Sequence, residues 1–503
     1  MRNRLLILLT VGITQVVLAQ KPVLLKYGEM VSEARLKDML TVISSDSMEG
    51  RKTGTQGQKM AAAFIREHFK NSGLIAPVNG DYYQMVRLYK NVPGQTYLKA
   101  GKQKFTNMER VLYFGNEDSG GEVSLPLVFA GLGREEDFVE LDVKDKAVLI
   151  RIDDGRLYSL PEVTRARANG AKMIFIWNTD NEEDFNAYLN QARYYQANAK
   201  ISIRKPTNRT PNPGYFILSP SIVAAVMNTS PEALKKTAKE SLSKNALSRI
   251  KAVNITYKTE INVDVTETEN VLGFLEGTDK KDEVLIITAH YDHIGKEEQG
   301  NGDLINNGAD DDGSGTVAVM ELARIFAKAK ADGNGPRRSI LFMTVTGEEE
   351  GLLGSSYYTQ NPIFPLSHTV VDLNMDMIGR RDQAHKESDP YVYIIGSDKI
   401  STELHQINES VNKKYCGLVF DYTYNDENHP SNLYYRSDHW NFAKNNIPII
   451  FFFDGIHEDY HKPSDELRKI GFDLLKKRAQ CVFYTAWEIA NRENRILPDS
   501  ESK

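Results

Sequence analysis

The chain has 503 residues, of which 41% are hydrophobic and 26% are charged, as in ordinary soluble proteins. This length exceeds what one hydrophobic core usually holds, so we expect two or more domains. The 62 basic and 68 acidic residues give a net charge of −6. Such a balance offers nothing to a phosphate backbone, so the composition argues against nucleic-acid binding.

The N-terminus has the pattern of a signal peptide covering residues 1–19. Arg2 and Arg4 precede an apolar stretch over residues 5–18, and a small-residue cleavage site ends at Ala19. The apolar stretch is short for a membrane span, so we expect no stable span after cleavage, with an uncleaved anchor as the alternative. The pattern predicts a secreted or periplasmic protein.

Cysteine content excludes a disulfide scaffold, because Cys416 and Cys481 are the only two cysteines. In an oxidising compartment they could form a pair. Cysteines in a large core are more often buried and free, so the sequence leaves open whether these two pair.

The first half of the chain contains two different textures. Residues 20–110 are predicted to begin the main domain, with two helical patterns between Ser32 and Lys70 that a turn-rich break separates. Over residues 111–255 strand-like segments alternate with loops and short helices. This second stretch predicts an inserted β-rich domain with a structural or substrate-gating role, because it contains no cluster of metal-binding or nucleophilic residues.

Residues 256–503 alternate strands with helices, which predicts a mostly parallel mixed sheet flanked by helices in an α/β fold. The expected strands are Asn270–Glu276, Val284–Thr288, Ser339–Thr344, Thr369–Asn374, Tyr391–Ile395 and Ile447–Phe453. The expected helices are Thr316–Lys330, Ser401–Tyr415 and Ser464–Arg492.

Histidines and carboxylates follow several of these strands directly. Because the carboxyl ends of parallel strands meet at one edge of a sheet, these side chains are expected to converge there. A mixed set of imidazoles and carboxylates suits zinc, and one carboxylate between two groups of ligands can bridge two ions. The clusters are His290–Asp292, the loop residues Asp310–Asp312, Glu348–Glu350, Asp376 and Tyr460–His461.

Each cluster also has an ordinary structural explanation. A histidine at a strand end is commonly a hydrogen-bonded surface residue, and the Glu348–Glu350 run is typical of a solvated loop. The Asp310–Asp312 run could cap the helix that follows it. Their joint occurrence at strand ends of one domain favours a metal site over separate structural roles.

The same motifs resemble those of the M28 zinc aminopeptidases. They read His290-Tyr-Asp-His-Ile-Gly295, Gly308-Ala-Asp-Asp-Asp-Gly-Ser-Gly315, Gly347-Glu-Glu-Glu-Gly-Leu-Leu-Gly-Ser355, Asn374-Met-Asp-Met-Ile-Gly379 and Tyr460-His461. The resemblance covers most of residues 263–492, and the segment 111–255 resembles a protease-associated (PA) domain. It implies a zinc-exopeptidase-like fold and two Zn²⁺ per chain.

This resemblance also implies residue roles. The implied zinc ligands are His290 and Asp376 on one ion, Glu349 and His461 on the other, and Asp311 bridging both. Glu348 would be the general base, Asp292 would orient the His290 imidazole, and Tyr460 would hydrogen-bond the developing oxyanion. Asp310 stands where the family commonly has Asn.

The function predicted from the sequence is a secreted or periplasmic dizinc aminopeptidase that removes N-terminal residues from peptides through a metal-bridging hydroxide. The alternatives are a carboxypeptidase or dipeptidase of the same family, a glutaminyl cyclase with one zinc, and a catalytically inactive peptidase-like binding module. Peptides are the expected partners, and an oligomer is left open.

Overall fold

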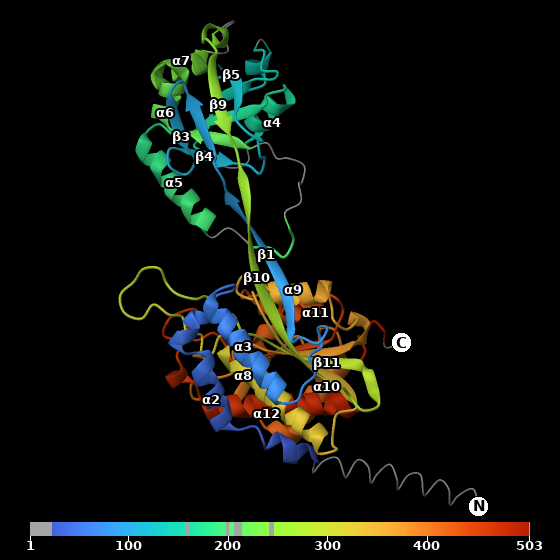
Figure 1. Ribbon diagram of the computed structural model, residues 1–503. Coiled ribbons are helices and arrows are strands. Elements are labelled where there is room, and N and C mark those ends of the chain that lie inside the picture. The colour runs from blue at the N-terminus through green and yellow to red at the C-terminus, as the bar shows by residue number, and fades with distance from the viewer. Residues whose placement is uncertain are drawn as a thin grey trace, which may run out of the picture. The chain divides into compact units, whose positions relative to one another are not determined.

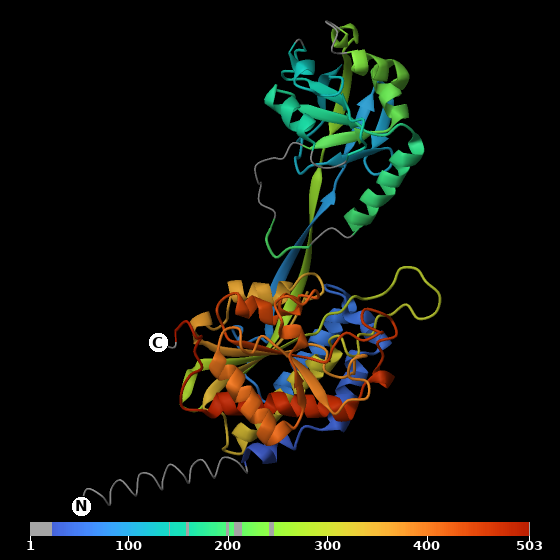
Figure 2. The ribbon, with the colours of Figure 1, turned by 180° about the vertical axis from the view of Figure 1, so that it is seen from behind.

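Residues 23–139, 141–156, 160–197, 201–205, 214–240 and 246–501 are described by a computed structural model (Figures 1 and 2). The predicted signal peptide lies outside these residues. The chain divides into unit 1, Met1–Arg87 with Thr266–Lys503, and unit 2, Leu88–Val265. The strands β1 (Tyr83–Pro93) and β10 (Ile261–Leu275) each contribute residues to both units.

Unit 1 is built on an eight-stranded sheet with the order β1-β10-β12-β11-β13-β16-β14-β15. Its centre is parallel, whereas β10 and β14 run antiparallel to their neighbours β12 and β16. The strands are β11 (Lys280–His290), β12 (Arg338–Val345), β13 (Thr369–Met375), β14 (Tyr391–Ile395), β15 (Val419–Asp421) and β16 (Ile449–Phe453), besides β1 and β10. This sheet and its helices confirm the predicted α/β class.

Alternate residues of β11 face opposite sides of the sheet. Leu285 and Ile287 join the core under the larger group of helices, whereas Val284 and Ile286 join the core under α9 and α11. The first group is α2 (Glu33–Ile43), α3 (Gln56–Asn71), α8 (Gly313–Ala331), α10 (Thr402–Val411) and α12 (Phe472–Asn491), and the second is α9 (Leu353–Gln360) and α11 (His439–Ala443). Because both faces are covered, the strand ends are where polar side chains gather.

Side-chain caps start four of these helices. Ser32, Thr55, Asp312 and Ser401 each accept a backbone N–H from the first turn of α2, α3, α8 and α10, as N-cap residues do. The remaining short helical segments are η1 (Asp46–Arg51), η2 (Glu136–Phe138), η3 (Leu247–Arg249), η4 (Leu366–His368), η5 (Asn412–Cys416), η6 (Thr423–Asn425), η7 (Leu433–Tyr435) and η8 (Leu467–Lys469).

The last helix begins later than predicted. The sequence pattern starts it at Ser464, whereas α12 starts at Phe472. Residues before it are held in a loop, because the Asp465 carboxylate accepts the backbone N–H groups of Asp310 and Asp311 at 3.0 and 3.1 Å. A contact with a distant segment therefore overrides the local helical pattern.

Cys416 and Cys481 form a disulfide between the end of η5 and α12, with their Cα atoms 5.3 Å apart. This decides a question that the sequence left open. The two cysteines are 65 residues apart in sequence, and their sulfurs meet because η5 packs against α12. Among the described residues, no helix combines the length and the apolar character that a membrane span requires.

Unit 2 has its own eight-stranded sheet, with the order β3-β2-β9-β5-β6-β7-β8-β4. Separate cores lie on its two faces, one with α6 and α7 and one with α4 and α5. The strands are β2 (Tyr97–Ala100), β3 (Gln103–Thr106), β4 (Val111–Phe114), β5 (Val123–Phe129), β6 (Ala147–Arg151), β7 (Met173–Trp177), β8 (Tyr215–Leu218) and β9 (Val253–Lys258). The helices are α4 (Pro161–Ala168), α5 (Glu182–Ala197), α6 (Pro220–Met227) and α7 (Pro231–Glu240).

The predicted insertion, residues 111–255, lies within unit 2, which is longer at both ends. The difference has a structural reason, because β2 and β3 precede residue 111 and β2 pairs with β9. The likeness of this unit to a PA domain stays a prediction.

Candidate metal centre

The carboxyl ends of the central strands of unit 1 bring the predicted ligands together. His290 is the last residue of β11 and pairs in register with Val345 at the end of β12, which leads into Glu348 and Glu349. Asp376 directly follows β13, and His461 lies in the segment after β16. Asp311 stands in the loop before α8. Because these parallel strands end at the same edge of the sheet, residues that are far apart in sequence lie close together there.

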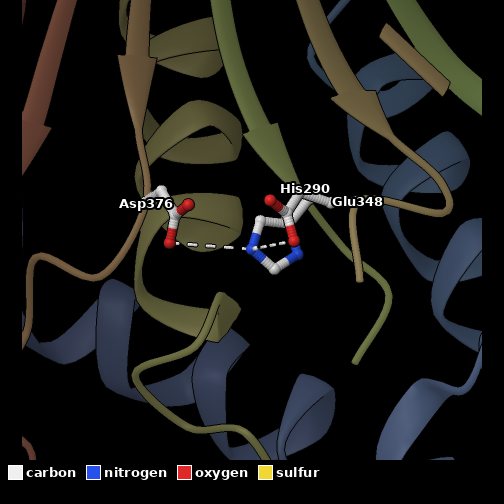
Figure 3. A group of neighbouring side chains, drawn as sticks. All are labelled: His290, Glu348 and Asp376. Carbon is white, nitrogen blue, oxygen red and sulfur yellow. Dashed lines mark ion pairs between the residues drawn. The ribbon is translucent and has the colours of Figure 1, made fainter. Parts of the chain in front are cut away.

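The first group of ligand atoms surrounds His290. Its Nε2 atom is 3.3 Å from Asp311 Oδ1, 3.6 Å from Asp376 Oδ1 and 3.9 Å from Glu348 Oε2. Figure 3 shows the His290 imidazole with the carboxylates of Asp376 and Glu348 directed to it. Ser437 Oγ donates to the second Asp376 oxygen at 2.6 Å, which fixes the orientation of that carboxylate.

The second group surrounds His461. Its Nε2 atom is 3.1 Å from Asp311 Oδ2 and 3.0 Å from Glu349 Oε2. A further imidazole, that of His293, places Nδ1 2.8 Å from Glu349 Oε1. The two oxygens of Asp311 therefore face different groups, Oδ1 toward His290 and Oδ2 toward His461.

These residues form the histidine–carboxylate cluster: His290, His293, Asp311, Glu348, Glu349, Asp376 and His461. Two sets of three within it have ligand atoms close enough to hold an ion, His290 with Glu348 and Asp376, and His293 with Asp311 and Glu349. Both sets lie in unit 1.

The chemistry of the cluster fits bound cations. Its four carboxylates, within the described part of the chain, form ion pairs with histidines only. Among the described residues, the buried atoms Asp311 Oδ2 and His461 Nε2 find no hydrogen-bond partner. Burying several carboxylates without a strong positive charge is costly, and metal ions remove that cost. Imidazole nitrogens and carboxylate oxygens are the donor set that zinc accepts.

The three aspartates before α8 have different contacts. Asp311 faces the cluster, whereas Asp312 accepts N–H groups from His290, Gly315 and Met377 and so ties β11, α8 and β13 together. Asp310 accepts the Gly379 N–H at 2.7 Å and faces His457 Nε2 at 3.2 Å. Capping of α8, one explanation considered for the run, therefore applies to Asp312 alone.

Asp292 contacts both His290 and the loop that carries Glu348. The His290 Nδ1 atom is 3.1 Å from the backbone oxygen of Asp292 but 3.9 Å from its carboxylate. That carboxylate accepts instead from Thr53 Oγ1 at 2.9 Å and from the Glu348 N–H at 3.2 Å. Burial raises the pKa of Asp292 to about 6. Its side chain thus holds the Glu348 loop, while its backbone oxygen meets the imidazole.

The cluster opens into a cavity with one apolar wall. Besides His290, Asp311, Glu348 and Asp376, the cavity is lined by Met377, Leu433, Arg436, Phe451, Phe453, Ile456 and Tyr460. The Tyr460 ring stacks on His461 with centroids 3.9 Å apart, and Arg436 Nη2 donates to the Tyr460 hydroxyl at 3.4 Å. Burial raises the pKa of Tyr460, so its hydroxyl remains protonated at neutral pH.

Comparison with known proteins gives a consistent assignment. Residues 270–486 match the model of Peptidase family M28. The chain is 25% identical over 381 residues to aminopeptidase YwaD of Bacillus subtilis, covering 74% of this chain and 68% of that enzyme. Residues 270–486, which carry the histidine–carboxylate cluster, are therefore similar to peptidase family M28.

Two further matches are shorter or more distant. A probable zinc metalloprotease of Pyricularia oryzae is 36% identical over 122 residues, which cover 24% of this chain and 23% of that protein. An aminopeptidase from Aneurinibacillus sp. strain AM-1, a solved structure, aligns with a TM-score of 0.47 at 19% identity over 93% of this chain and 97% of that chain. The matches to family M28 and to its named relatives confirm the predicted enzyme class, a zinc metallopeptidase.

Two residues of unit 1 received no role in the sequence analysis. His293 lies in the His-Tyr-Asp-His run, but sequence alone does not show that its ring turns toward Glu349. Arg51 is fully buried and donates to backbone oxygens of Ile43, Tyr291 and Asn307, so it joins the loops that carry the cluster. The sequence signal for such a role was the place of Arg51 next to Gly50 in a turn-rich segment. A turn exposes backbone carbonyl groups, and a buried arginine requires several such acceptors.

His429 and His439, which flank the cavity-lining residues Leu433 and Arg436 in sequence, contact groups outside the cluster. His439 is fully buried, with Nε2 2.8 Å from the Tyr434 backbone oxygen and its ring stacked on Phe451. His429 places Nδ1 2.6 Å from Ser431 Oγ. These contacts of both imidazoles lie outside the histidine–carboxylate cluster.

Proposed function

We propose that this enzyme is a dizinc aminopeptidase that releases N-terminal residues from peptides. The observation that carries the proposal is the position of Asp311, whose two oxygens face the His290 group and the His461 group separately. His290 and Asp376 would hold one Zn²⁺, Glu349 and His461 the other, and Asp311 both. When bound, the ions would make a water acidic enough to ionise near neutral pH and would polarise the scissile carbonyl.

Glu348 is the proposed general base. Its carboxylate lines the cavity, and Asp292 fixes its backbone through the Glu348 N–H. Burial raises the pKa of Glu348 well above its usual range, and the carboxylates of Glu349 and Asp376 raise it further. A carboxylate of raised pKa accepts a proton from the attacking water and returns one to the leaving amine more readily than an exposed one.

The cavity supports a substrate with an apolar first side chain. Met377, Leu433, Phe451, Phe453 and Ile456 supply its apolar wall, and burial of an aliphatic or aromatic side chain there contributes about 1.5–3 kcal/mol. The carboxylates of Asp311, Glu348 and Asp376, which also line the cavity, are suitable partners for a free α-ammonium group. The protonated Tyr460 hydroxyl would donate to the oxygen on which negative charge develops.

A dipeptidase is the second candidate, and Arg436 is the observation that favours it. It is the arginine among the residues that line the cavity, and it lies beside Tyr460. A guanidinium group there would bind the carboxylate of a dipeptide. Relative turnover of dipeptides and longer peptides separates the two candidates.

We also propose that the enzyme acts in an oxidising compartment, either secreted or periplasmic. The disulfide between Cys416 and Cys481 supports this, because disulfides persist mainly in such compartments. The signal-peptide pattern of the sequence supports it independently.

The deciding experiment measures hydrolysis of aminoacyl-anilides with a free or an acetylated α-amine by the wild type and by Glu348→Gln. We expect turnover of the free-amine substrates only, with leucyl- and phenylalanyl-anilides cleaved faster than aspartyl-anilide. Glu348→Gln should lower kcat by at least about 100-fold, because general-base catalysis contributes that much, while the zinc content stays unchanged.

Glu350→Gln is the matched control, since Glu350 lies in the same loop outside the cavity lining and the cluster. It should retain wild-type turnover. Equal hydrolysis of acetylated substrates would contradict aminopeptidase action, and the absence of turnover with zinc bound would favour a cyclase or an inactive binding module.

A further inference from the structure

His293 is a buried member of the histidine–carboxylate cluster that the five implied ligands and the base leave without a role. It follows β11 by three residues, and 1% of its surface is exposed. Its backbone N–H donates to the Arg51 backbone oxygen at 3.2 Å, which anchors the residue between two loops of unit 1.

Glu349 is held between two imidazoles. Its Oε1 atom is 2.8 Å from His293 Nδ1, and its Oε2 atom is 3.0 Å from His461 Nε2. Only Oε2 therefore faces the group that contains Asp311 Oδ2 and His461. His293 Nδ1 lies farther from Asp311 Oδ2, at 3.8 Å.

The short contact is a hydrogen bond in which His293 is the donor. A separation of 2.8 Å matches an N–H···O⁻ bond to an ionised carboxylate. His293 Nε2, the other ring nitrogen, is buried and has no hydrogen-bond partner in the described structure, which agrees with the proton residing on Nδ1.

The surrounding backbone leaves room for this ring and holds it in place. Gly308 has a positive φ of 54°, and a Cβ atom there would lie 2.6 Å from His293 Cδ2. A side chain at residue 308 would therefore clash with the Asp311 backbone oxygen, at 2.3 Å, as well as with the imidazole. The ring is confined between the Gly308 backbone and Glu349, so it presents Nδ1 to one carboxylate oxygen.

We propose that His293 is a positioning residue for the second metal. Its Nδ1–H group donates a hydrogen bond to Glu349 Oε1. The other oxygen of that carboxylate, Oε2, is then the one available to an ion held by Asp311 and His461. The inference rests on the proposed assignment of Glu349 as a zinc ligand. Partners that orient metal ligands in this way commonly account for 10–100-fold in metal affinity.

The test is zinc binding to metal-free protein, measured by competition with a chromophoric chelator. The variants are His293→Leu, which removes the donor, and His293→Asn, whose amide nitrogen can occupy the place of Nδ1. We expect His293→Leu to weaken one of the two zinc sites by about 10–100-fold and to leave the other unchanged. His293→Asn should bind both ions within a few-fold of the wild type.

His439→Asn is the control, because it also removes a buried imidazole but one that faces the Tyr434 backbone oxygen. Both zinc affinities should be unchanged in it. The melting temperature of each variant without metal separates loss of folding from loss of binding. If His293→Leu does not fold, His293→Gln replaces it, since its amide reaches the place of Nε2 instead of Nδ1 and should bind zinc as weakly.

Wild-type affinity of both sites in His293→Leu, or in His293→Gln where that variant replaces it, would overturn the proposal. Equal weakening in His293→Asn and His293→Leu would overturn it as well, because the ring would then act as a ligand. A wild-type chain that binds two zinc ions but hydrolyses no peptide would refute the proposed function alone and leave this inference intact.

Discussion

Two clusters of buried charge lie side by side in unit 1, and they are neutralised in different ways. The histidine–carboxylate cluster has four carboxylates whose ion-pair partners in the described structure are histidines. In the second cluster, here called the arginine network, three of the four carboxylates pair with an arginine and the fourth pairs with a histidine. Its members are Asp310 with His457, Asp454 with Arg478, and Asp459 and Asp465 with Arg380.

Adjacent residues of the same loop serve the two clusters. Asp310 belongs to the arginine network and Asp311 to the histidine–carboxylate cluster. The comparison shows that burial alone does not mark a metal site. The distinguishing feature is a set of buried carboxylates for which the protein supplies no strong permanent cation.

Removing an internal cation should have the largest effect on stability. Arg478 is fully buried on α12 and contacts Asp454 Oδ2 at 3.1 Å and the backbone oxygens of Ile378 and Arg380, each at 2.8 Å. Arg478→Met should lower the free energy of unfolding by about 3–5 kcal/mol in urea titration, because Asp454 loses its charge partner inside the core.

Lys476→Met on the same helix is the control for that measurement. Its ion pair with Glu33, at 3.3 Å, is one-third to one-half exposed, so the change should stay below about 1 kcal/mol. Similar losses in both variants would show that the arginine network is not held by buried pairing.

Removing an external cation should have a somewhat smaller effect, and only on the other cluster. Thorough chelation should lower the free energy of unfolding by about 3 kcal/mol for each zinc ion initially present near 100 times its Kd, and should lower the melting temperature measured by calorimetry. Asp311→Asn should respond less to chelation, because it removes the carboxylate that faces both groups. An unchanged melting temperature after the metal is shown to be gone would contradict the distinction between the clusters.

The smallest expected effect is a pH dependence that belongs to the arginine network. Burial lowers the pKa of His457, but its hydrogen bond and charge interaction with Asp310 outweigh this and raise the pKa from 6.5 to about 9. The pair therefore stabilises the fold fully below about pH 6.5, and this contribution is lost as the pH rises through 9. We expect the wild type to lose on the order of 2 kcal/mol more than His457→Gln across that window, measured by urea titration.

His405→Gln, which alters a partly buried histidine facing Ser397 Oγ at 2.9 Å, should retain the wild-type pH slope. An identical slope in the wild type and His457→Gln would show that the Asp310–His457 pair does not carry this dependence.

The sequence by itself determined the fold class, most elements of unit 1 and the convergence of the motifs. Apolar runs such as Val284–Thr288 reveal buried strands, because a parallel sheet covered on both faces requires continuous hydrophobic residues. Polar residues that end such strands must meet at one edge of the sheet, so the strand pattern alone is enough to place His290 and Asp376 together.

Only the tertiary structure decided how neighbouring residues divide their contacts. Asp310, Asp311 and Asp312 are chemically identical in sequence, and their separate partners depend on β13, His457 and His461, which lie far along the chain. The same holds for the disulfide, for the late start of α12 and for His293 turning toward Glu349. Sequence periodicity reports local backbone and burial, whereas these contacts are fixed by packing between segments that no local pattern relates.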